Sequence, residues 1–466
     1  MDFIRIVIEY TGIFFIAYLI GYSTFLFLSV IVGGTVLFDK RKKERLKNVL
    51  NHDYYMPITI IVPAYNEEVT VVDSVKSLLS LDYQLYEIVV VDDGSSDSTS
   101  QKMIEHFDMK QIRRPINRAV KCKPVRAIYS TDQQKVPITL IKKENGGKAD
   151  ALNMGINASK FPYFICMDAD SVLQQDSLKE IMNTILEDNN IIAAGGLVRP
   201  SNGLKIMEGR VINYRLPPKI LVAMQTLEYE RSFLASRLLL DQFNGNLIIS
   251  GAFGMFKKDI VIDAGGYDHS TIGEDMELVV KLHVFCRANN RPYLIKYAPD
   301  AICWTQVPER LHDLTSQRRR WHLGLFQSMW KYKEVFANPR FGAISWISYF
   351  YFLVYELASP FIELFGIITI VLAFLVELIN VKFMIMFFLI YVIFGVILTT
   401  TAFINRIYTQ NQTLYLTDII KATGLCVIEI SVLRFIMAWV RITAFIGYNR
   451  RKTDWGKIER QKINLR

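Results

Sequence analysis

Apolar residues follow two patterns along this chain: long uncharged runs near both ends and short runs in the middle. The first long run covers residues 10–38 and is followed by a basic cluster at residues 40–43. It is too long for a signal-peptide core and long enough for a helix that crosses a bilayer. We therefore expect an N-terminal membrane span, with the segment after the basic cluster in the cytoplasm.

The middle of the chain, residues 56–337, alternates short apolar strands with helical patterns. Residues 58–62, 87–91 and 163–167 are apolar or β-branched runs, and each ends in a turn. Runs without polar alternation predict parallel strands that are covered on both faces. Repeated strand–turn–helix units predict a doubly wound, mostly parallel α/β sheet, with its ligand crevice at the carboxyl ends of the strands.

One basic stretch interrupts this repeat. Residues 107–136 carry Pro115 and Pro124 and show no clear periodicity. We expect an inserted surface loop there, and its sequence indicates no function.

Apolar segments return after residue 340. Residues 341–356 are rich in aromatics and short for a span, which predicts an interfacial helix. Residues 360–379 and 383–404 each match the thickness of one bilayer. The last apolar segment, residues 423–448, contains Glu429, Arg434 and Arg441.

The parity of the spans decides how this last segment is interpreted. One span before the globular region and two after it return the chain to the cytoplasm, where the basic tail also belongs. We expect residues 423–448 to lie on the membrane or re-enter it; the alternative is a fourth crossing within residues 341–379. The predicted division is 1–39 (N-terminal transmembrane helix), 40–340 (cytoplasmic domain), 341–448 (membrane region) and 449–466 (basic cytoplasmic tail).

Composition supports a membrane location. Of 466 residues 51% are hydrophobic, and the net charge is +9. The basic clusters stand beside apolar segments, so we attribute them to the membrane surface and expect no nucleic-acid partner. The five cysteines have no zinc-site spacing and are expected to be reduced thiols.

Polar residues gather at the ends of the predicted strands. Tyr65 and Glu67 lie in the first strand–helix turn, where an aromatic ring can contact a base and backbone N–H groups suit a diphosphate. Asp93 follows the second strand and can accept a hydrogen bond from a uracil N3–H. Each turn, taken alone, is equally an ordinary capped turn.

Asp168 and Asp170 follow the third strand. Two carboxylates at this spacing offer oxygen ligands to Mg²⁺ or Mn²⁺, with substrate phosphates completing the shell. Lys148 follows Gly146 and Gly147 and can neutralise a leaving diphosphate, although the spacing differs from that of a P-loop.

Two further groups complete the candidate chemistry. Asp275 begins a predicted helix. A carboxylate there can remove a proton from a hydroxyl, or it is simply stabilised by the helix dipole. Gln317, Arg320 and Trp321 share one helical face and form a candidate sugar platform; the alternative is a basic amphipathic helix at the membrane, and both can hold. The histidines, including His283 and His322, are expected to be structural or exposed on the surface.

In their order along the chain, these motifs resemble the inverting, membrane-bound family-2 glycosyltransferases. That family includes synthases of cellulose, hyaluronan, chitin oligosaccharide and poly-N-acetylglucosamine. The resemblance covers residues 58–321 and the flanking membrane segments. It implies a GT-A-like domain, a UDP-sugar donor of the glucose or N-acetylglucosamine type, a glycan acceptor and a divalent cation.

The resemblance also assigns roles. It implies that the uridine is held by Ala64, Tyr65, Glu67 and Asp93, and that Lys148 contacts the nucleotide or its diphosphate. It places Asp168 and Asp170 at the diphosphate and metal, Asp275 as the base, and Gln317, Arg320 and Trp321 at the acceptor. Gly273 stands where the family usually has Thr, the turn at residues 250–254 resembles the acceptor-side loop, and Trp455 with Gly456 resembles a gating segment.

The sequence as a whole predicts a processive polysaccharide synthase in the plasma membrane, multi-pass, that inverts the anomeric carbon. A non-processive transferase that adds one sugar to a lipid or glycan is the alternative, and an inactive scaffold or transporter subunit a more remote one. The membrane region is small for a complete polymer channel. We therefore expect export to need a homo-oligomer or a partner.

Overall fold

The computed structural model describes residues 2–47, 56–207, 210–212, 215–409 and 415–448. The basic tail, residues 449–466, and its Trp455 and Gly456 lie outside these ranges.

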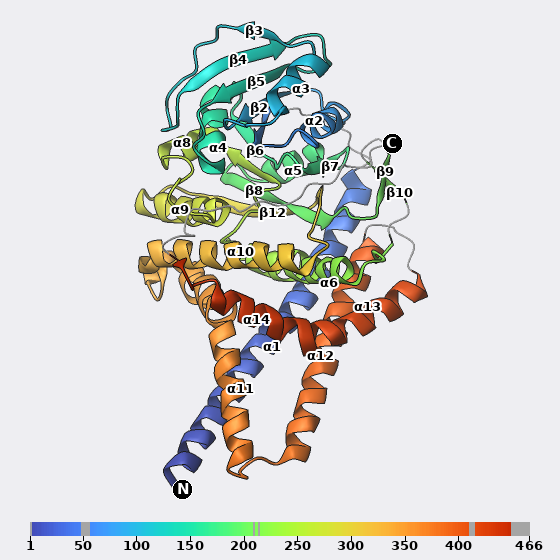
Figure 1. Ribbon diagram of the computed structural model, residues 1–466, viewed down its shortest axis with the longest axis vertical. Helices are drawn as coiled ribbons and strands as arrows, with labels where there is room; N and C mark the ends of the chain where they lie inside the picture. Colours follow the sequence, from blue (N-terminus) through green and yellow to red (C-terminus); the bar gives the residue numbers. More distant parts are fainter. Residues whose placement is uncertain (1, 48–55, 208–209, 213–214, 410–414, 449–466) are drawn as a thin grey trace.

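A ten-stranded mixed sheet forms the centre of the globular domain, in the order β3-β4-β5-β2-β1-β6-β11-β8-β12-β7 (Figure 1). Strands β5, β2, β1 and β6 run parallel to one another, whereas β11 pairs antiparallel with both β6 and β8. The described strands are β1 (Ile58–Ala64), β2 (Tyr86–Asp92), β3 (Lys110–Ile112), β4 (Val125–Thr131), β5 (Ile138–Lys143), β6 (Tyr163–Cys166), β7 (Ser171–Leu173), β8 (Ile191–Pro200), β9 (Lys205–Met207), β10 (Arg210–Ile212), β11 (Gly254–Lys257) and β12 (Leu294–Thr305).

The parallel centre is buried on both faces, as its unbroken apolar runs predict. Ile58, Ile60 and Val62 of β1 pack into one hydrophobic core, and Ile61 packs into a second core on the opposite face. Helices α2 and α5 contribute to the first core, and α4 and α9 to the second. The predicted doubly wound α/β fold is therefore confirmed, with antiparallel strands added around the parallel centre.

The stretch at residues 107–136 contains more regular structure than its sequence indicates. It includes strands β3 and β4, and β4 pairs antiparallel with β5 at one edge of the sheet. All three residues of β3 are exposed. An edge strand without a buried face has no alternating apolar pattern, which is why the sequence predicts a loop here.

Helices surround the sheet and continue away from it (Figure 1). The described helices are α1 (Asp2–Lys47), α2 (Val71–Leu79), α3 (Thr99–His106), α4 (Lys148–Ala158), α5 (Ser177–Ile185), α6 (Ile220–Tyr229), η1 (Glu230–Ser236), α7 (Arg237–Asp241), α8 (Lys258–Asp263), α9 (Glu274–Ala288), α10 (Leu311–Lys331), η2 (Lys333–Val335), η3 (Pro339–Phe341), η4 (Ile344–Tyr349), η5 (Phe352–Leu357), α11 (Ser359–Leu375), α12 (Val381–Thr409), α13 (Leu416–Ile428), η6 (Glu429–Leu433) and α14 (Arg434–Thr443).

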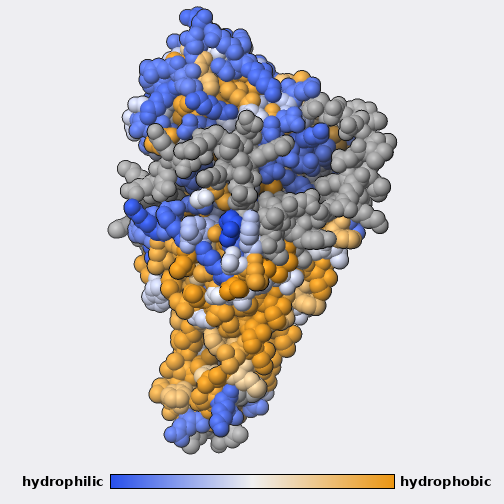
Figure 2. All heavy atoms as spheres, turned by 90° about the vertical axis from the view of Figure 1, so that its right-hand side faces the viewer, coloured by the Kyte–Doolittle hydropathy of each residue, from blue (hydrophilic) through white to orange (hydrophobic). Residues whose placement is uncertain are grey.

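Two described helical segments are long and apolar enough to cross a membrane, Ile6–Asp39 and Met384–Ile404. A third candidate is the pair Ile344–Leu357 and Ser359–Leu375, which is bent by 50°. The bend coincides with Pro360 at the start of α11, where proline favours a new helix and opposes continuation of the previous one. Figure 2 shows the apolar surface that these helices present at one end of the molecule.

Two of the three charged residues of the last apolar segment, Glu429 and Arg434, form ion pairs. Arg434 of α14 lies 2.7 Å from the carboxylate of Glu363 in α11, and Glu429 lies 2.6 Å from Arg231 in η1. Ion pairing is how charges are accommodated beside apolar helices. The α13–η6–α14 segment is not among the candidate spans of the described residues, and its position on the membrane stays a prediction.

His283 is one of the buried polar residues that support α9. Its Nδ1 lies 2.8 Å from the Tyr293 hydroxyl and its Nε2 2.9 Å from the Asn246 carbonyl oxygen. The ring is 1% exposed, and burial lowers the pKa of the imidazole to about 4. The prediction of a structural role for this residue agrees with these contacts.

This burial makes stability depend on pH. Because the folded-state pKa lies below the ordinary value of 6.5, the folded ring stays neutral between pH 6.5 and 4 while the unfolded chain takes up a proton, so stability is complete above pH 6.5 and falls as the pH falls toward 4. We expect protonation linked to His283 to lower the free energy of unfolding by about 3 kcal/mol as the pH falls across that window. Thermal unfolding of detergent-solubilised His283→Gln should depend less on pH than that of wild type. His312→Gln, at an exposed position, is the control; equal pH profiles for all three proteins would contradict the assignment.

Candidate active site

A cavity of about 1090 Å³ opens at the carboxyl ends of the central strands and extends to α10 and η5. Residues far apart in the sequence line it, and all but one of the predicted site residues are among them: Tyr65, Glu67, Asp93, Lys148, Asp168, Asp170, Asp275, Gln317, Arg320 and Trp321. Ala64 is the exception. Its side chain is buried, and its carbonyl oxygen accepts a hydrogen bond from the Asp93 N–H at 2.9 Å.

The turns after β1 and β2 are hydrogen-bonded to each other. The Asn66 N–H donates to the Ser95 hydroxyl at 3.0 Å, and the Glu67 N–H donates to the Thr99 hydroxyl at 2.8 Å. Asn66 has a φ of 56°, a conformation that asparagine tolerates better than most residues. This arrangement leaves the Tyr65 ring 53% exposed on the cavity wall, where it can contact a planar ligand.

Asp93 lies within a buried network that the sequence motifs only partly reveal. Its carboxylate accepts hydrogen bonds from the Gly147 N–H at 2.7 Å and the Gly146 N–H at 3.0 Å, and it pairs with the Lys143 ammonium. Burial raises the pKa of Asp93, and Lys143 opposes that rise. Lys143 also lies 2.6 Å from Asp150. Asp93 therefore fixes the glycine turn that begins α4, besides lining the cavity.

That turn places Lys148 between two carboxylates. Its ammonium lies 2.6 Å from Asp168 Oδ1 and 3.2 Å from Glu274 Oε1. Burial alone would lower the pKa of Lys148, but the two carboxylates raise it above its ordinary value, so the side chain is a fixed cation. Burial raises the pKa of the Glu274 carboxyl to about 7. Asp168 and Glu274 are thus bridged by one positive charge.

The residues present fit a divalent cation that is shared with a ligand. No cluster of three or more His, Cys, Asp or Glu side chains suited to a metal ion occurs in the described part of the chain. Asp168 and Asp170 both line the cavity after β6, so the protein supplies two carboxylates and phosphate oxygens would supply further ligands. This is the usual way in which Mg²⁺ is bound beside phosphates.

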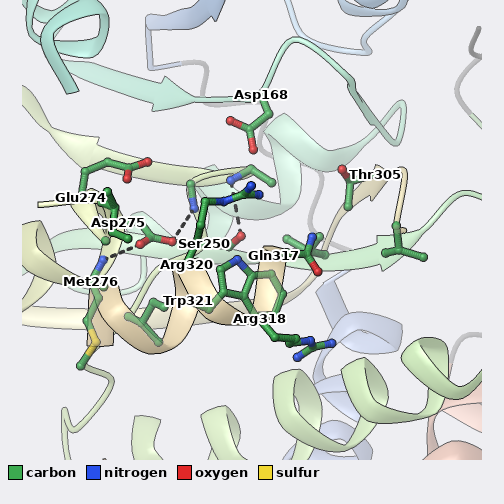
Figure 3. A pocket seen from close by; sticks show the side chains of 18 of the residues that line it. Asp168, Ser250, Glu274, Asp275, Met276, Thr305, Gln317, Arg318, Arg320 and Trp321 are labelled. Atoms are coloured by element: carbon green, nitrogen blue, oxygen red, sulfur yellow. Dashed lines mark hydrogen bonds between the residues drawn. The ribbon is translucent and has the colours of Figure 1, made fainter. Parts of the chain in front are cut away.

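Asp275 lies in the first turn of α9, across the cavity from Asp168 (Figure 3). Its Oδ1 accepts a hydrogen bond from the Met276 N–H at 2.8 Å, and its Oδ2 accepts one from the Gly251 N–H at 3.3 Å. Gly251 belongs to the turn at residues 250–254 that the sequence associates with the acceptor side. The fold therefore brings this turn against the candidate base.

Trp321 projects from α10 into the same cavity and is 46% exposed (Figure 3). The Arg318 guanidinium lies 4.5 Å from the centre of the indole, and the Tyr229 ring is tilted against it at 6.4 Å. Arg318 is itself paired with Glu228 at 2.6 Å. These contacts orient the indole from one side and leave part of its surface available to a ligand.

The structure adds residues that contact the candidate site residues and that the sequence does not single out: Lys143, Asp150, Glu228, Tyr229, Glu274 and Arg318. Glu274 and Arg318 stand inside predicted motifs and Asp150 two residues from Lys148, but nothing in those motifs indicates their partners. Glu228 and Tyr229 belong to α6, whose sequence has no catalytic pattern.

Comparisons with protein families give two matches. The model described as Glycosyl transferase family 2 matches residues 59–263, and the model described as Glycosyl transferase family group 2 matches residues 163–446. The second match covers more than half of the chain and extends into the helices after the sheet domain.

Similar proteins include poly-beta-1,6-N-acetyl-D-glucosamine synthases of two staphylococci. The Staphylococcus aureus (strain COL) protein is 31% identical over 316 residues, which cover 66% of this chain and 65% of that protein. The Staphylococcus epidermidis protein is 30% identical over 316 residues, covering 66% and 64%. The matched region thus spans slightly less than two thirds of each relative.

One solved structure is similar over nearly the whole chain. It is a mannosyltransferase from Pyrobaculum calidifontis in complex with GDP-Man and Mn²⁺, with a TM-score of 0.51 and 18% sequence identity. The similarity covers 93% of this chain and 99% of that one. At this identity it is evidence for the fold alone.

Proposed function

We propose that this chain, which belongs to glycosyltransferase family 2, is a processive polysaccharide synthase that uses a UDP-sugar of the N-acetylglucosamine or glucose type. The membership, the GT-A-like fold and the enzyme class are established by the family matches and the structural similarity. The candidate spans and the similarity to the staphylococcal synthases make it a membrane protein. The donor, the acceptor and processivity are what is proposed.

One observation carries the proposal. A single cavity is lined by Tyr65 and Asp93, the proposed donor residues, by Asp168 and Lys148, and by Trp321, the proposed acceptor residue. An enzyme that joins two sugars needs a nucleotide site and a sugar platform on either side of one base. The similar synthases are named for a polymer of N-acetylglucosamine, which favours that sugar as the first donor to test.

The proposed reaction follows from the positions of these residues. Asp275 accepts the proton of the acceptor hydroxyl, whose oxygen attacks the anomeric carbon from the face opposite the UDP. The bond to UDP breaks, and the configuration is inverted. Lys148, a fixed cation beside Asp168, neutralises charge on the leaving diphosphate. A divalent cation held by Asp168, Asp170 and the donor phosphates would stabilise the same charge.

We further propose a multi-pass arrangement in the plasma membrane with the sheet domain, residues 40–340, in the cytoplasm. The basic residues that follow the first span support this orientation. The cavity reaches Tyr351, Phe352 and Glu356 of the segment before α11, so the acceptor end faces the membrane region. Export of a polymer through so few spans would require a second copy or a partner.

Product size tests this function. Purified protein incubated with UDP-N-acetylglucosamine or UDP-glucose and Mg²⁺ or Mn²⁺ should release UDP and produce polymer, and chelation of the cation should abolish both. Products that carry a single added sugar would replace the synthase with a non-processive transferase. If neither nucleotide sugar binds nor is hydrolysed, the proposed donor class is wrong.

The base is tested by Asp275→Asn. Transfer should fall about 10²- to 10⁴-fold because proton removal from the acceptor is lost, while donor affinity is nearly unchanged. Calorimetric titration with UDP and a turnover assay separate the two effects. Asp259→Asn is the control, since that side chain is 63% exposed on α8. Loss of UDP binding along with turnover would instead make Asp275 a structural or metal-binding residue.

The platform is tested by Trp321→Phe and Trp321→Ala. Both should shorten the polymer at an unchanged apparent KM for the nucleotide sugar, because the indole holds the terminal sugar. Slow donor hydrolysis should persist. Trp330 of the same helix is 64% exposed, and Trp330→Phe and Trp330→Ala are matched controls. Normal product length from both Trp321 variants would indicate that the indole only anchors the helix at the membrane surface.

A further inference from the structure

The loop before α9 and the helix α10 meet backbone to backbone. A Cβ placed on Gly324 of α10 would lie 2.7 Å from the Gly273 Cα and 2.9 Å from the Gly273 nitrogen. A Cβ placed on Gly273 would lie 2.8 Å from the Gly324 Cα and 2.9 Å from its carbonyl carbon. Side-chain carbons do not approach backbone atoms this closely. The backbone at each of the two positions therefore leaves no room for a side chain at the other.

Space, and not backbone conformation, is what requires glycine at both positions. Gly273 has a φ of −107°, which other residues adopt, and Gly324 lies within the 21-residue helix α10. Glycine within a helix is unfavourable compared with alanine because it loses more conformational freedom on folding. Two glycines facing each other are therefore explained by the approach of the two segments.

A side chain one turn further along α10 fixes the same loop. Gln327 Oε1 accepts hydrogen bonds from the Thr271 hydroxyl at 2.9 Å and from the Ile272 N–H at 3.0 Å. The Gln327 amide group donates to the Tyr448 hydroxyl at 3.4 Å. The loop at residues 271–273 is thus attached to α10 at two successive turns, by contact at Gly324 and by hydrogen bonds at Gln327.

The two attached segments carry opposite halves of the acceptor site. Glu274 and Asp275 follow Gly273 directly, and Trp321 stands three residues before Gly324 on α10. A shift of α10 relative to the loop would therefore change the position of the sugar platform relative to the base. Both halves line the same cavity (Figure 3).

We propose that Gly324 and Gln327 are positioning residues that hold the base Asp275 in register with the acceptor platform of α10. This inference rests on the proposed roles of Asp275 and Trp321. A Cβ at position 324 requires the segments to separate by roughly 0.7 Å, from 2.7 Å to the 3.4 Å at which ordinary contact begins. Displacements of about 1 Å within a reacting geometry can cost about 10²-fold in rate.

Gly324→Ala tests the contact. We expect a roughly 10- to 100-fold fall in kcat for transfer, with nucleotide-sugar affinity within about 2-fold of wild type, because the donor residues lie on other elements. The hydrolysis-to-transfer ratio should rise. Gly424→Ala is the matched control, since Gly424 also lies in a helix and its Cβ would meet no heavy atom within 4 Å. Wild-type kcat in Gly324→Ala, or equal losses in both variants, would overturn the proposal.

Gln327 supplies a second test that does not require a repacked helix. Gln327→Ala should reproduce the kcat loss with unchanged donor affinity. Gln327→Glu should restore most of it, because its carboxylate accepts both hydrogen bonds although it cannot donate to Tyr448. A Glu variant as impaired as the Ala variant would overturn the role of these two hydrogen bonds.

Hydrogen exchange tests the contact between α10 and the loop at residues 271–273 without a measurement of turnover. In wild type the Ile272 and Glu277 amides are hydrogen-bonded to Gln327 and to the Gly273 carbonyl oxygen. Exchange of peptides covering residues 271–277 should be about 10-fold faster in Gly324→Ala and unchanged in Gly424→Ala. Unchanged exchange in Gly324→Ala would overturn the proposal. Absence of transfer by wild type with every nucleotide sugar would refute the proposed function while this measurement still decides the contact.

Discussion

The candidate active site depends on one largely buried ammonium group, that of Lys148. Its side chain is 17% exposed and lies between Asp168, which follows β6, and Glu274, which begins α9. A buried carboxylate without a partner is strongly destabilising, so removing this cation would leave the buried Glu274 close to the partly exposed Asp168 with no positive charge between them. The charge therefore joins the carboxyl end of the parallel sheet to the helix that carries the candidate base, and it lies on the wall of the cavity.

A second buried lysine, Lys143, helps to fix the position of Lys148. Lys143, at the end of β5, holds Asp93 and Asp150, and Asp93 in turn accepts hydrogen bonds from the Gly146 and Gly147 backbone. The position of Lys148 is thus set by a network behind it and not by its own flexible chain. A site built this way is organised before the donor arrives, which is the condition under which fixed charges stabilise a transition state.

Helix α10, which carries the candidate acceptor residues, is in contact with the C-terminal helix α14. On α10, Arg319 donates to the Thr443 hydroxyl at 3.4 Å, and the His322 ring packs edge-on against Phe445. The helix α14, which ends at Thr443, is joined to α11 by the Arg434–Glu363 pair, and Figure 1 shows it lying across the base of the sheet domain. The helix that carries Trp321 is therefore supported by the loop before the candidate base on one side and by α14 on the other.

The sequence by itself determined the parallel centre of the sheet and most of the cavity wall. Apolar runs such as residues 58–62 and 87–91 need burial on both faces, and parallel strands bring their carboxyl ends together. Asp93, Asp168 and Asp170 could therefore be placed near one another from local pattern alone. The tertiary structure decided the partners. Packing between segments that are distant in the sequence sets the contacts of Lys143 with Asp150, Arg318 with Glu228, and Gly273 with Gly324. A local sequence pattern does not indicate such contacts. The edge strand β3 was missed for a related reason: a strand supported mainly by its neighbour, here β4, needs no buried face and leaves no periodic signal.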